Sequence, residues 1–543
     1  MPSASVPPSV RPPAGEVLPA EMEQDPDLWL RVFAWIIAAT SIAQVLVFSF
    51  GQDQGAYATV ARGLLEGRVP YRDLWSAHPP GIYFVFAAAF GLFGENMAAP
   101  RLLEALCLVG VVLSCRRLGG VFFGSRVGGL LGGATACLVQ AQTDFWHTAQ
   151  PGSFGGALVL FALVTTTHAW PRRRLHLAVL VAGLLIGIAG TLEPTLTIMA
   201  LPLGGYLLLT RRKQGFPLKK QLGPPLTLLG AALLPWTLLL VWFAHKDALG
   251  DLGWALSVFQ FGNAALWVEQ SAPHLVYQAL KEALFEQSAL VAAGVLAAIA
   301  VHPRANREKE GLLLVASILA LDLAGVAFRS SFEQKDFAAA LPLLSLIAGP
   351  GLYKLWRRIG PGSLPGALAF AALLLVLPLM RGPGRDLPQS YWERSRLRIT
   401  YLLSGGKGLR HEELERQLDH VGTFNLQSAR AVSRFLGQKL PLAACLDVRG
   451  AEPIVYFLSQ RLPCDRFVQP PAVPVLGESS AGLAARLATR EPGVDAPTAW
   501  VLSPSLGLPT PELEALEQRL GPRAEIEGYS VFLSEQPARV PEH

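Results

Sequence analysis

Residues Gly51 to Gly81 read GQDQGAYATVARGLLEGRVPYRDLWSAHPPG and follow directly on the first long apolar segment. The stretch is too long and too rich in acids to serve only as a link between two membrane helices. Asp53 lies a few residues beyond the apolar segment, where a carboxylate is costly unless it faces water or a partner. Asp73 and His78 follow, directly before a rigid Pro79-Pro80 pair. The stretch therefore predicts a structured, water-facing loop beside a membrane.

The composition places much of the chain in lipid. Of its 543 residues, 51% are hydrophobic and 16% are charged, whereas an ordinary soluble domain has about 25% charged residues. The net charge of +5 is small for this length and is expected mainly on cytoplasmic loops, so we expect no nucleic-acid partner. The five cysteines form no CxxC pair and no metal-ligand spacing. Cys445 and Cys464 could form a disulfide if their part of the chain is extracytoplasmic.

The apolar segments predict a polytopic α-helical membrane protein with about eleven transmembrane helices, since about 20 apolar residues cross a bilayer. Basic clusters such as Arg116-Arg117 and Arg172 to Arg174 are separated by pairs of these segments. All of them can therefore lie on one side, which the positive-inside rule makes the cytoplasm. The N-terminus is then cytoplasmic, and the chain after Met380 is extracytoplasmic. The predicted spans are 29–50, 98–115, 126–142, 154–170, 176–192, 196–210, 226–244, 288–302, 311–328, 338–353 and 364–380.

One apolar stretch, Ile82 to Phe93, is left over. Counting it as a span would place Arg116-Arg117 outside and invert every later basic cluster. It is also short, as expected of an interfacial or re-entrant helix. We therefore expect an external juxtamembrane helix within a first loop that covers 51–97. The other external loops are then 143–153, 193–195, 245–287 and 329–337.

The two ends of the chain differ from the apolar middle. Residues 1–28 are rich in Pro, Ser and Glu and predict a disordered cytoplasmic tail before a transmembrane domain over 29–383. Residues 384–543 turn soluble in composition and predict a small extracytoplasmic α/β domain. Its expected strands are 442–448, 499–503 and 529–533, and its expected helices are 452–458 and 510–520.

The order of residues in the first loop resembles that of the GT-C superfamily of membrane glycosyltransferases. That order is an apolar helix, Asp53, Tyr57, Pro70-Tyr71, Asp73 and then Pro-Pro-Gly. The likeness is closest to the protein O-mannosyltransferase and aminoarabinose-transferase group, covers about residues 29–380 and is most specific in this loop. It implies transfer of a sugar from a polyprenyl-phosphate donor to a hydroxyl of a glycan, lipid or protein outside the membrane. A composition rich in Arg, Ala, Leu and Gly suggests the inner membrane of a bacterium.

By this resemblance, Asp53 is the catalytic carboxylate of an inverting transfer, because the acceptor hydroxyl must be activated as it attacks. Without the resemblance, Asp53 could simply cap a helix that begins near Gly55. Many members carry a second acid beside the first, where this chain has Gln54. The sequence indicates no cofactor, and it leaves open whether the reaction needs a divalent metal ion.

Further candidates lie in the predicted external loops. Asp144, in QTDFWHTAQPG, is the nearest match to a second catalytic acid of the family, and His147 lies one helical turn away. Asp73 and His78 are candidate substrate ligands in the first loop, although His78 could simply hydrogen-bond the Pro-Pro turn. Glu193, directly before Pro194, is either a third acid or a capping group.

The donor is a phosphate ester, so the site needs a cation on the outer side. Arg329 and Lys335 lie in FRSSFEQKDFAAALPLLSLIAG, and Lys335 best matches the basic residue that precedes a similar span in the family. Arg101, at the outer end of the second span, is another candidate phosphate ligand. The alternative is a surface ion pair with Glu333 or Asp336, worth under about 1 kcal/mol.

Two other classes of function compete with an enzyme. A transporter or lipid-linked-sugar flippase needs ionisable groups at mid-membrane, and Asp322 is the clear candidate. A non-catalytic assembly protein would work through its C-terminal part. The 245–287 loop can cover the active site in the family, but its aromatic and acidic residues also suit a membrane interface; they are Asp251, Trp254, Trp267, Glu269 and Tyr277.

Overall fold

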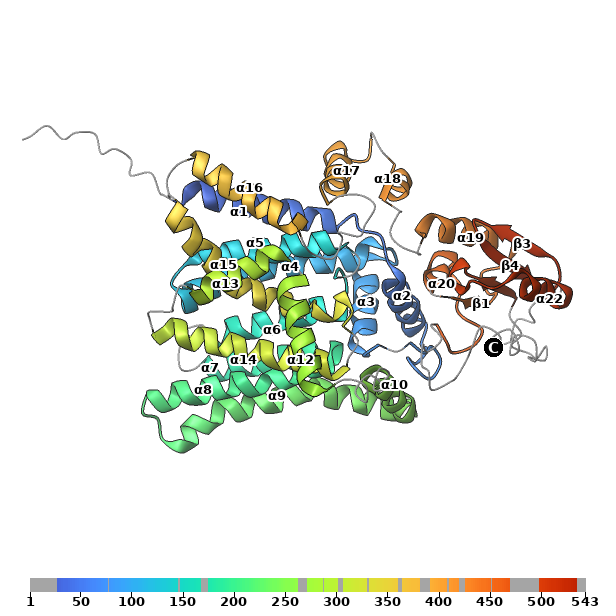
Figure 1. Cartoon of the computed structure of the whole chain (residues 1–543). Coiled ribbons are helices and arrows are strands. Elements are labelled where there is room, and N and C mark those ends of the chain that lie inside the picture. The colour runs from blue at the N-terminus through green and yellow to red at the C-terminus, as the bar shows by residue number, and fades with distance from the viewer. Residues whose placement is uncertain are drawn as a thin grey trace, which may run out of the picture.

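Most helices of the chain run side by side in one bundle, and a small sheet with its own helices lies beyond one end of it (Figure 1). The structure is a computed structural model. It describes residues 27–76, 78–144, 147–167, 174–261, 271–286, 288–300, 306–329, 332–359, 364–380, 391–407, 410–418, 425–450, 452–468 and 498–534. The predicted disordered tail lies almost wholly outside these residues.

Each predicted span overlaps a helix of the bundle. These helices are α1 (Leu28–Val45), α4 (Ala98–Phe123), α5 (Arg126–Thr143), α6 (Pro151–Thr167), α7 (Leu175–Leu192), α8 (Ala200–Lys213), α9 (Leu218–His245), α13 (Ala289–Ala300), α14 (Asn306–Arg329), α15 (Ala340–Ile359) and α16 (Leu364–Met380). Among the described residues, five helices are long and apolar enough to cross a membrane: α1, α4, α7, α9 and α14. A membrane fold is therefore supported, while the count of about eleven spans stays a prediction.

Small residues let the helices of the bundle approach closely. A Cβ on Gly129 of α5 would lie 2.2 Å from the carbonyl oxygen of Cys115 in α4. On the other side, a Cβ on Gly349 of α15 would lie 2.2 Å from the carbonyl oxygen of Gly128. Only glycine fits at such contacts. Small residues are common where helices pack within a membrane, because the hydrophobic effect does not drive helices together in lipid.

Two helices of the first loop lie across the end of the bundle, between it and the sheet (Figure 1). They are α2 (Gln52–Leu65) and α3 (Gly81–Phe93). With 13 residues, α3 is too short to span a bilayer, which fits the expected juxtamembrane helix. The first loop is thus an ordered layer, and α2 begins at Gln52 instead of near Gly55.

The C-terminal part contains a mixed four-stranded sheet of order β1-β2-β4-β3. Strand β1 (Leu446–Arg449) is parallel to β2 (Ala499–Leu502), which is antiparallel to β4 (Tyr529–Leu533). These strands and helices α20 (Ile454–Ser459) and α22 (Thr510–Leu520) overlap the predicted elements. Strand β3 (Arg523–Ile526) was not predicted, because its sequence RAEI is short, carries two charges and lacks an apolar run. The other α-helices described in the C-terminal part are α17 (Tyr391–Ser404), α18 (His411–Leu418) and α19 (Leu426–Lys439).

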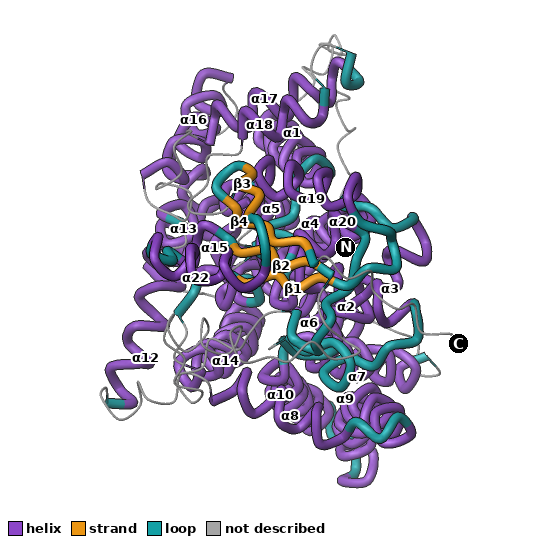
Figure 2. The backbone as a smooth tube through the Cα atoms, turned by 90° about the vertical axis from the view of Figure 1, so that its right-hand side faces the viewer, coloured by secondary structure: helices purple, strands orange, loops and turns teal. Residues whose placement is uncertain are grey.

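The C-terminal part packs directly on the layer formed by α2 and α3. Seen end-on, the strands lie in front of the ends of the bundle helices (Figure 2). A Cβ on Gly55 of α2 would lie 2.7 Å from the Cα of Ile454 in α20. Arg62 of α2 donates hydrogen bonds to the carbonyl oxygens of Tyr456 (3.2 Å) and Phe457 (3.0 Å). The C-terminal part therefore contacts the helix that carries Asp53 directly.

Candidate active site

Asp53 lies in the first turn of α2, where the positive end of the helix dipole favours a carboxylate. Gln54 explains why the helix begins here, because its Oε1 accepts a hydrogen bond from the backbone N–H of Gly51 (2.9 Å). Its Nε2 donates to the carbonyl oxygen of Thr148 (2.8 Å). Gln54 stands where many family members have a second acid, and here its side chain holds the start of the helix.

Side chains from three distant parts of the chain surround the Asp53 carboxylate. Lys335 Nζ lies 2.9 Å from Oδ2, and Gln150 Nε2 lies 3.5 Å from the same oxygen. His78 Nε2 lies 3.7 Å from Oδ1. Burial alone would raise the pKa of Asp53, but the charge of Lys335 and the hydrogen bonds from Lys335 and Gln150 outweigh it and hold the pKa below its usual value. Asp53 is therefore an ionised carboxylate with 16% of its side chain exposed.

Lys335 brings a fixed positive charge to this site. It lies in the short 3-10 helix η4 (Gln334–Phe337), and its Nζ also contacts Glu333 Oε2 at 2.8 Å. Burial would lower the pKa of Lys335, but Asp53 and Glu333 raise it above its usual value. Two carboxylates thus share one ammonium group, which stays protonated at any physiological pH.

His78 is neutral, in contrast to Lys335. Burial is the largest influence and lowers the pKa of His78 from 6.5 to about 4, although Asp53 opposes the shift. The imidazole lies edge-on to the ring of Tyr57, with 4.9 Å between ring centroids, and Ser76 Oγ is 3.1 Å from Nδ1. The contact between His78 and Asp53 is therefore a polar contact of a neutral ring and not an ion pair.

The low pKa of His78 makes folding sensitive to acid. The folded pKa lies below that of the unfolded chain, so this contribution to stability is complete above pH 6.5 and is lost as the pH falls to about 4. The full effect is about 3 kcal/mol. We expect His78→Gln to flatten the loss of thermal stability between pH 6.5 and 4, measured on detergent-purified protein. The same change at the exposed His274 should leave the wild-type slope, and an unchanged slope in His78→Gln would contradict the expectation.

Two residues that the sequence did not single out for a role orient Asp53. The hydroxyl of Tyr57 donates a hydrogen bond to Gln150 Oε1 (2.9 Å), which turns Nε2 of the same amide toward Asp53. Gln150 is almost wholly buried. Its position directly before Pro151, at the start of α6 in a predicted external loop, is the signal that could have identified it.

Asp144 does not join this group, contrary to its prediction as the second catalytic acid. It ends α5, and its Oδ2 contacts Arg394 (3.0 Å) and Arg398 of α17. Burial would raise the pKa of Asp144, but Arg398 and Arg394 hold it below its usual value. One carboxylate bound between two buried guanidinium groups links the bundle to the C-terminal part, which indicates a structural role for Asp144.

A structural role and a catalytic role of Asp144 predict different results. Breaking a buried ion pair by removing one partner costs about 3–5 kcal/mol. We therefore expect Asp144→Asn to lower the thermal unfolding temperature clearly, and transfer activity per folded molecule to stay within a few-fold of the wild type. Loss of activity without loss of stability would restore the catalytic assignment. Arg394→Met tests the same link from its other side, and the double variant should lose less stability than the sum of the two single changes.

Arg101 also differs from its prediction as a phosphate ligand. Its side chain is completely buried in α4 and donates to Glu104 Oε2 (3.1 Å). It donates further to the backbone carbonyl oxygens of Phe48 (3.2 Å) and Ser49 (2.8 Å). Arg101 therefore fixes the chain that leads from α1 into the first loop, and no surface of it is open to a ligand.

The other predicted residues lie around η4 or away from the site. His147 Nε2 is 2.8 Å from the carbonyl oxygen of Gln334, one residue before Lys335. Arg329 contacts Glu193 at 2.5 Å and lies 3.8 Å from Asp336 of η4. These residues hold the segment that presents Lys335.

Asp73 belongs to a turn of the first loop, since it accepts a hydrogen bond from the backbone N–H of Val69 (2.7 Å) and pairs with Arg72 (2.9 Å). Tyr277 is exposed on α12 (Ala272–Lys281). Trp267 and Glu269 lie outside the described residues. Within the parts of the chain that the structure describes, no three His, Cys, Asp or Glu side chains are placed to hold a metal ion.

Fold and site together define a class of protein: an α-helical membrane protein with an ionised carboxylate and a lysine at one end of its bundle. The family model described as "Dolichyl-phosphate-mannose-protein mannosyltransferase" matches residues 77–242. This family match, which begins after Asp53, and the fold shared with solved structures support a GT-C superfamily glycosyltransferase, as the resemblance predicted. A comparison with curated proteins finds no match.

Solved structures share this fold at low sequence identity. ArnT from Cupriavidus metallidurans bound to undecaprenyl phosphate matches with a TM-score of 0.54 and 15% identity, over 95% of this chain and 100% of that one. Its apo state matches with a TM-score of 0.53 and 13% identity, over 93% and 97% of the two chains. Both likenesses extend over nearly the whole chain, including the C-terminal part.

Proposed function

We propose that this protein transfers one sugar from a polyprenyl-phosphate donor to a hydroxyl acceptor on the extracytoplasmic side of a bacterial inner membrane. The observation that carries the proposal is the contact of Asp53 Oδ2 with Lys335 Nζ at 2.9 Å. The transfer needs a carboxylate for the acceptor and a cation for the departing phosphate. The match to mannosyltransferases that use dolichyl phosphate and the undecaprenyl phosphate bound by the similar ArnT support this class of donor.

Asp53 is the group that activates the acceptor. Its ionised carboxylate accepts a hydrogen bond from the acceptor hydroxyl and receives the proton as the hydroxyl oxygen attacks the anomeric carbon. The bond between that carbon and the phosphate oxygen breaks, and its electron pair stays on the phosphate. The proton then passes from Asp53 to solvent or to the released phosphate. A single displacement of this kind inverts the anomeric configuration.

Lys335 stabilises the charge that develops on the leaving phosphate. Without donor, its ammonium group is held by Asp53 and Glu333. A donor phosphate competes for that ammonium group and so releases Asp53 for the acceptor. The neutral imidazole of His78 lies near the other oxygen of Asp53, Oδ1, and can donate one hydrogen bond to the substrate. Gln150 keeps the Asp53 carboxylate in place during the exchange.

The sidedness follows from the predicted topology and from the cysteines. The disulfide between Cys445 and Cys464 is typical of proteins outside the cytoplasm, which supports an extracytoplasmic C-terminal part and a cytoplasmic N-terminus. The first loop and η4 pack on that side. We therefore place the site at the outer surface of the membrane, where polyprenyl-phosphate sugars meet their acceptors.

Purified full-length protein, incubated with a panel of radiolabelled polyprenyl-phosphate sugars, tests the proposal. Glycan, lipid and protein fractions of a bacterial envelope serve as separate acceptors. We expect label to move from at least one donor to one fraction, and the product to have the opposite anomeric configuration. Movement of intact donor across a liposome membrane without transfer would instead favour the flippase, for which buried Asp322 of α14 is the candidate group.

A further inference from the structure

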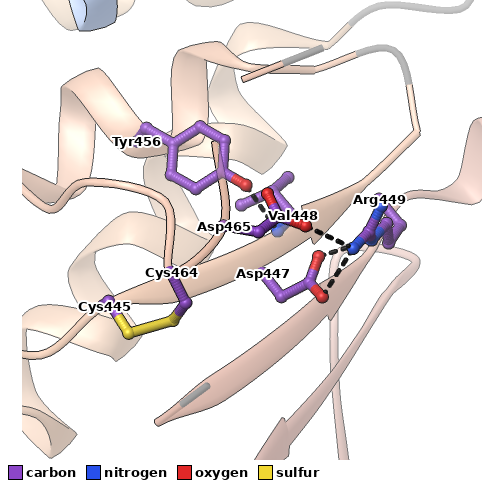
Figure 3. The surroundings of a disulfide bond; sticks show 7 residues. All are labelled: Cys445, Asp447, Val448, Arg449, Tyr456, Cys464 and Asp465. Atoms are coloured by element: carbon purple, nitrogen blue, oxygen red, sulfur yellow. Dashed lines mark hydrogen bonds and ion pairs between the residues drawn. A yellow bond between two sulfur atoms is a disulfide. The ribbon is translucent and has the colours of Figure 1, made fainter. Parts of the chain in front are cut away.

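The five residues from Cys464 to Val468 form a strap along the edge of the sheet. Cys464 is joined to Cys445 by a disulfide (Figure 3). Its backbone N–H donates to the carbonyl oxygen of Leu446 in β1 (2.9 Å). Both cysteines are partly exposed, so a small reductant can reach the bond. The disulfide therefore ties the start of the strap to the sheet.

A second contact ties the strap to the same strand. Arg449, at the end of β1, binds Asp447 (2.8 Å) and Asp465 of the strap (3.0 Å) (Figure 3). The guanidinium group thus bridges the two carboxylates. The strap thus has two anchors on β1, one covalent and one ionic.

The far end of the strap pairs with the first loop. The backbone N–H of Trp75 donates to the carbonyl oxygen of Arg466, and the N–H of Val468 donates to the carbonyl oxygen of Trp75 (3.0 Å). The rings of Trp75 and Phe467 lie 5.6 Å apart. Trp75 is completely buried. The strap therefore satisfies both backbone groups of one residue of the loop that carries Asp53.

The strap also reaches α10 (Leu249–Phe261), in the external segment between α9 and α13. Arg466 pairs with Asp251 at 3.0 Å, and its guanidinium group lies 5.2 Å from the ring of Trp254. The rings of Trp254 and Trp75 lie 4.9 Å apart. One segment of the C-terminal part thus joins the sheet, the first loop and α10.

From Trp75 the contacts lead to the candidate active site. The next residue, Ser76, has its Oγ 3.1 Å from His78 Nδ1, and its carbonyl oxygen accepts from the hydroxyl of Tyr83 (3.0 Å). The opposite ring nitrogen, Nε2 of His78, lies 3.7 Å from Asp53. Displacement of Trp75 would therefore rotate or shift the imidazole that faces the carboxylate.

We propose that the strap is a positioning element for His78, and that the disulfide between Cys445 and Cys464 makes the activity depend on oxidation. This rests on the proposed function in one respect, that His78 acts beside Asp53. A dithiol reductant breaks the S–S bond: two electrons and two protons convert the cysteines to thiols, and the reductant becomes a disulfide. The strap then keeps only its noncovalent anchors, and Trp75 loses a rigid partner.

Transfer kinetics with and without a dithiol reductant test the proposal in the full-length protein. We expect reduction to lower kcat about tenfold, the equivalent of one well-placed contact, and to change KM for the donor less than twofold. The double variant Cys445→Ser/Cys464→Ser should have the low kcat from the start and should not respond to the reductant. Unchanged kcat in reduced wild type, with the bond shown to be broken by thiol labelling, would overturn the proposal.

Hydrogen exchange gives a readout that needs no transfer activity. Reduction should speed deuterium uptake in peptides covering residues 69–76, while uptake in α15 of the bundle should not change. Faster exchange on reduction, without any detectable transfer in the oxidised protein, would reject the proposed function. It would still support the strap as the element that holds residues 69–76 in place. Normal transfer with no change in exchange or kcat on reduction would reject the strap and keep the function.

Discussion

Asp53→Asn is expected to lower the rate of sugar transfer by about 10²–10⁴-fold, the usual contribution of a positioned acid or base. The amide keeps the shape of the side chain and can still accept a hydrogen bond from Lys335 and Gln150, so the fold should survive. It cannot take the proton of the acceptor hydroxyl. The loss should therefore appear in kcat, with KM for the donor changed little, measured by transfer of radiolabelled sugar from polyprenyl phosphate.

The matched control for this change is Glu66→Gln. Glu66 directly follows α2, at the end opposite Asp53, and is exposed, so it loses the same charge outside the site. It should keep wild-type kinetics, and both variants should elute from detergent size exclusion as the wild type does. Equal activity of Asp53→Asn and the wild type would contradict Asp53 as the activating group, and Asp144→Asn would then be the next variant to assay.

Lys335→Met should have the second large effect, a fall in kcat of about 10²–10³-fold, as for the loss of one electrostatic donor in other enzymes. The change also removes the main positive partner of Asp53, so the pKa of Asp53 should rise. The acidic limb of the pH–rate profile should therefore move to higher pH in the variant. This second signature separates the removal of a cation beside Asp53 from a general loss of structure.

Two further variants sharpen the test of Lys335. Lys335→Arg keeps the charge and should recover part of the lost rate, because phosphate accepts hydrogen bonds from guanidinium groups as well. Lys246→Met removes an exposed lysine from the segment after α9, which the sequence predicts to be external, and should leave kcat and the pH profile unchanged. A normal rate in Lys335→Met would show that another cation meets the phosphate.

Much of the helix and strand pattern could be predicted from the sequence. The length and apolarity of the segments predicted the bundle helices, because a helix surrounded by lipid or by protein interior needs a long run of apolar residues. The Pro-Pro-Gly turn and the acids of the first loop marked the site's central residue, Asp53. The sequence also singled out the basic residue before α15, Lys335, and the structure shows that it contacts Asp53.

The partners of buried charges could not be predicted in the same way. Asp144 and Arg101 lie at predicted outer ends of helices, just as functional residues would. Asp144 is neutralised by Arg394 and Arg398, more than two hundred residues further along the chain, and no local pattern links them. Arg101 turns inward to Glu104 and to backbone carbonyl oxygens. This orientation depends on the path that the chain takes directly after α1.

By itself the sequence determined where most helices lie, which loop carries Asp53, and that a part containing strands follows the bundle. Those properties depend on local periodicity, length and turn residues, which each segment carries alone. Only the tertiary structure decided that Asp53 meets Lys335, 282 residues away, and that the C-terminal strap holds Trp75. Such contacts depend on the close packing of elements distant in sequence, because a charge taken out of water is stable only beside the partner that packing supplies.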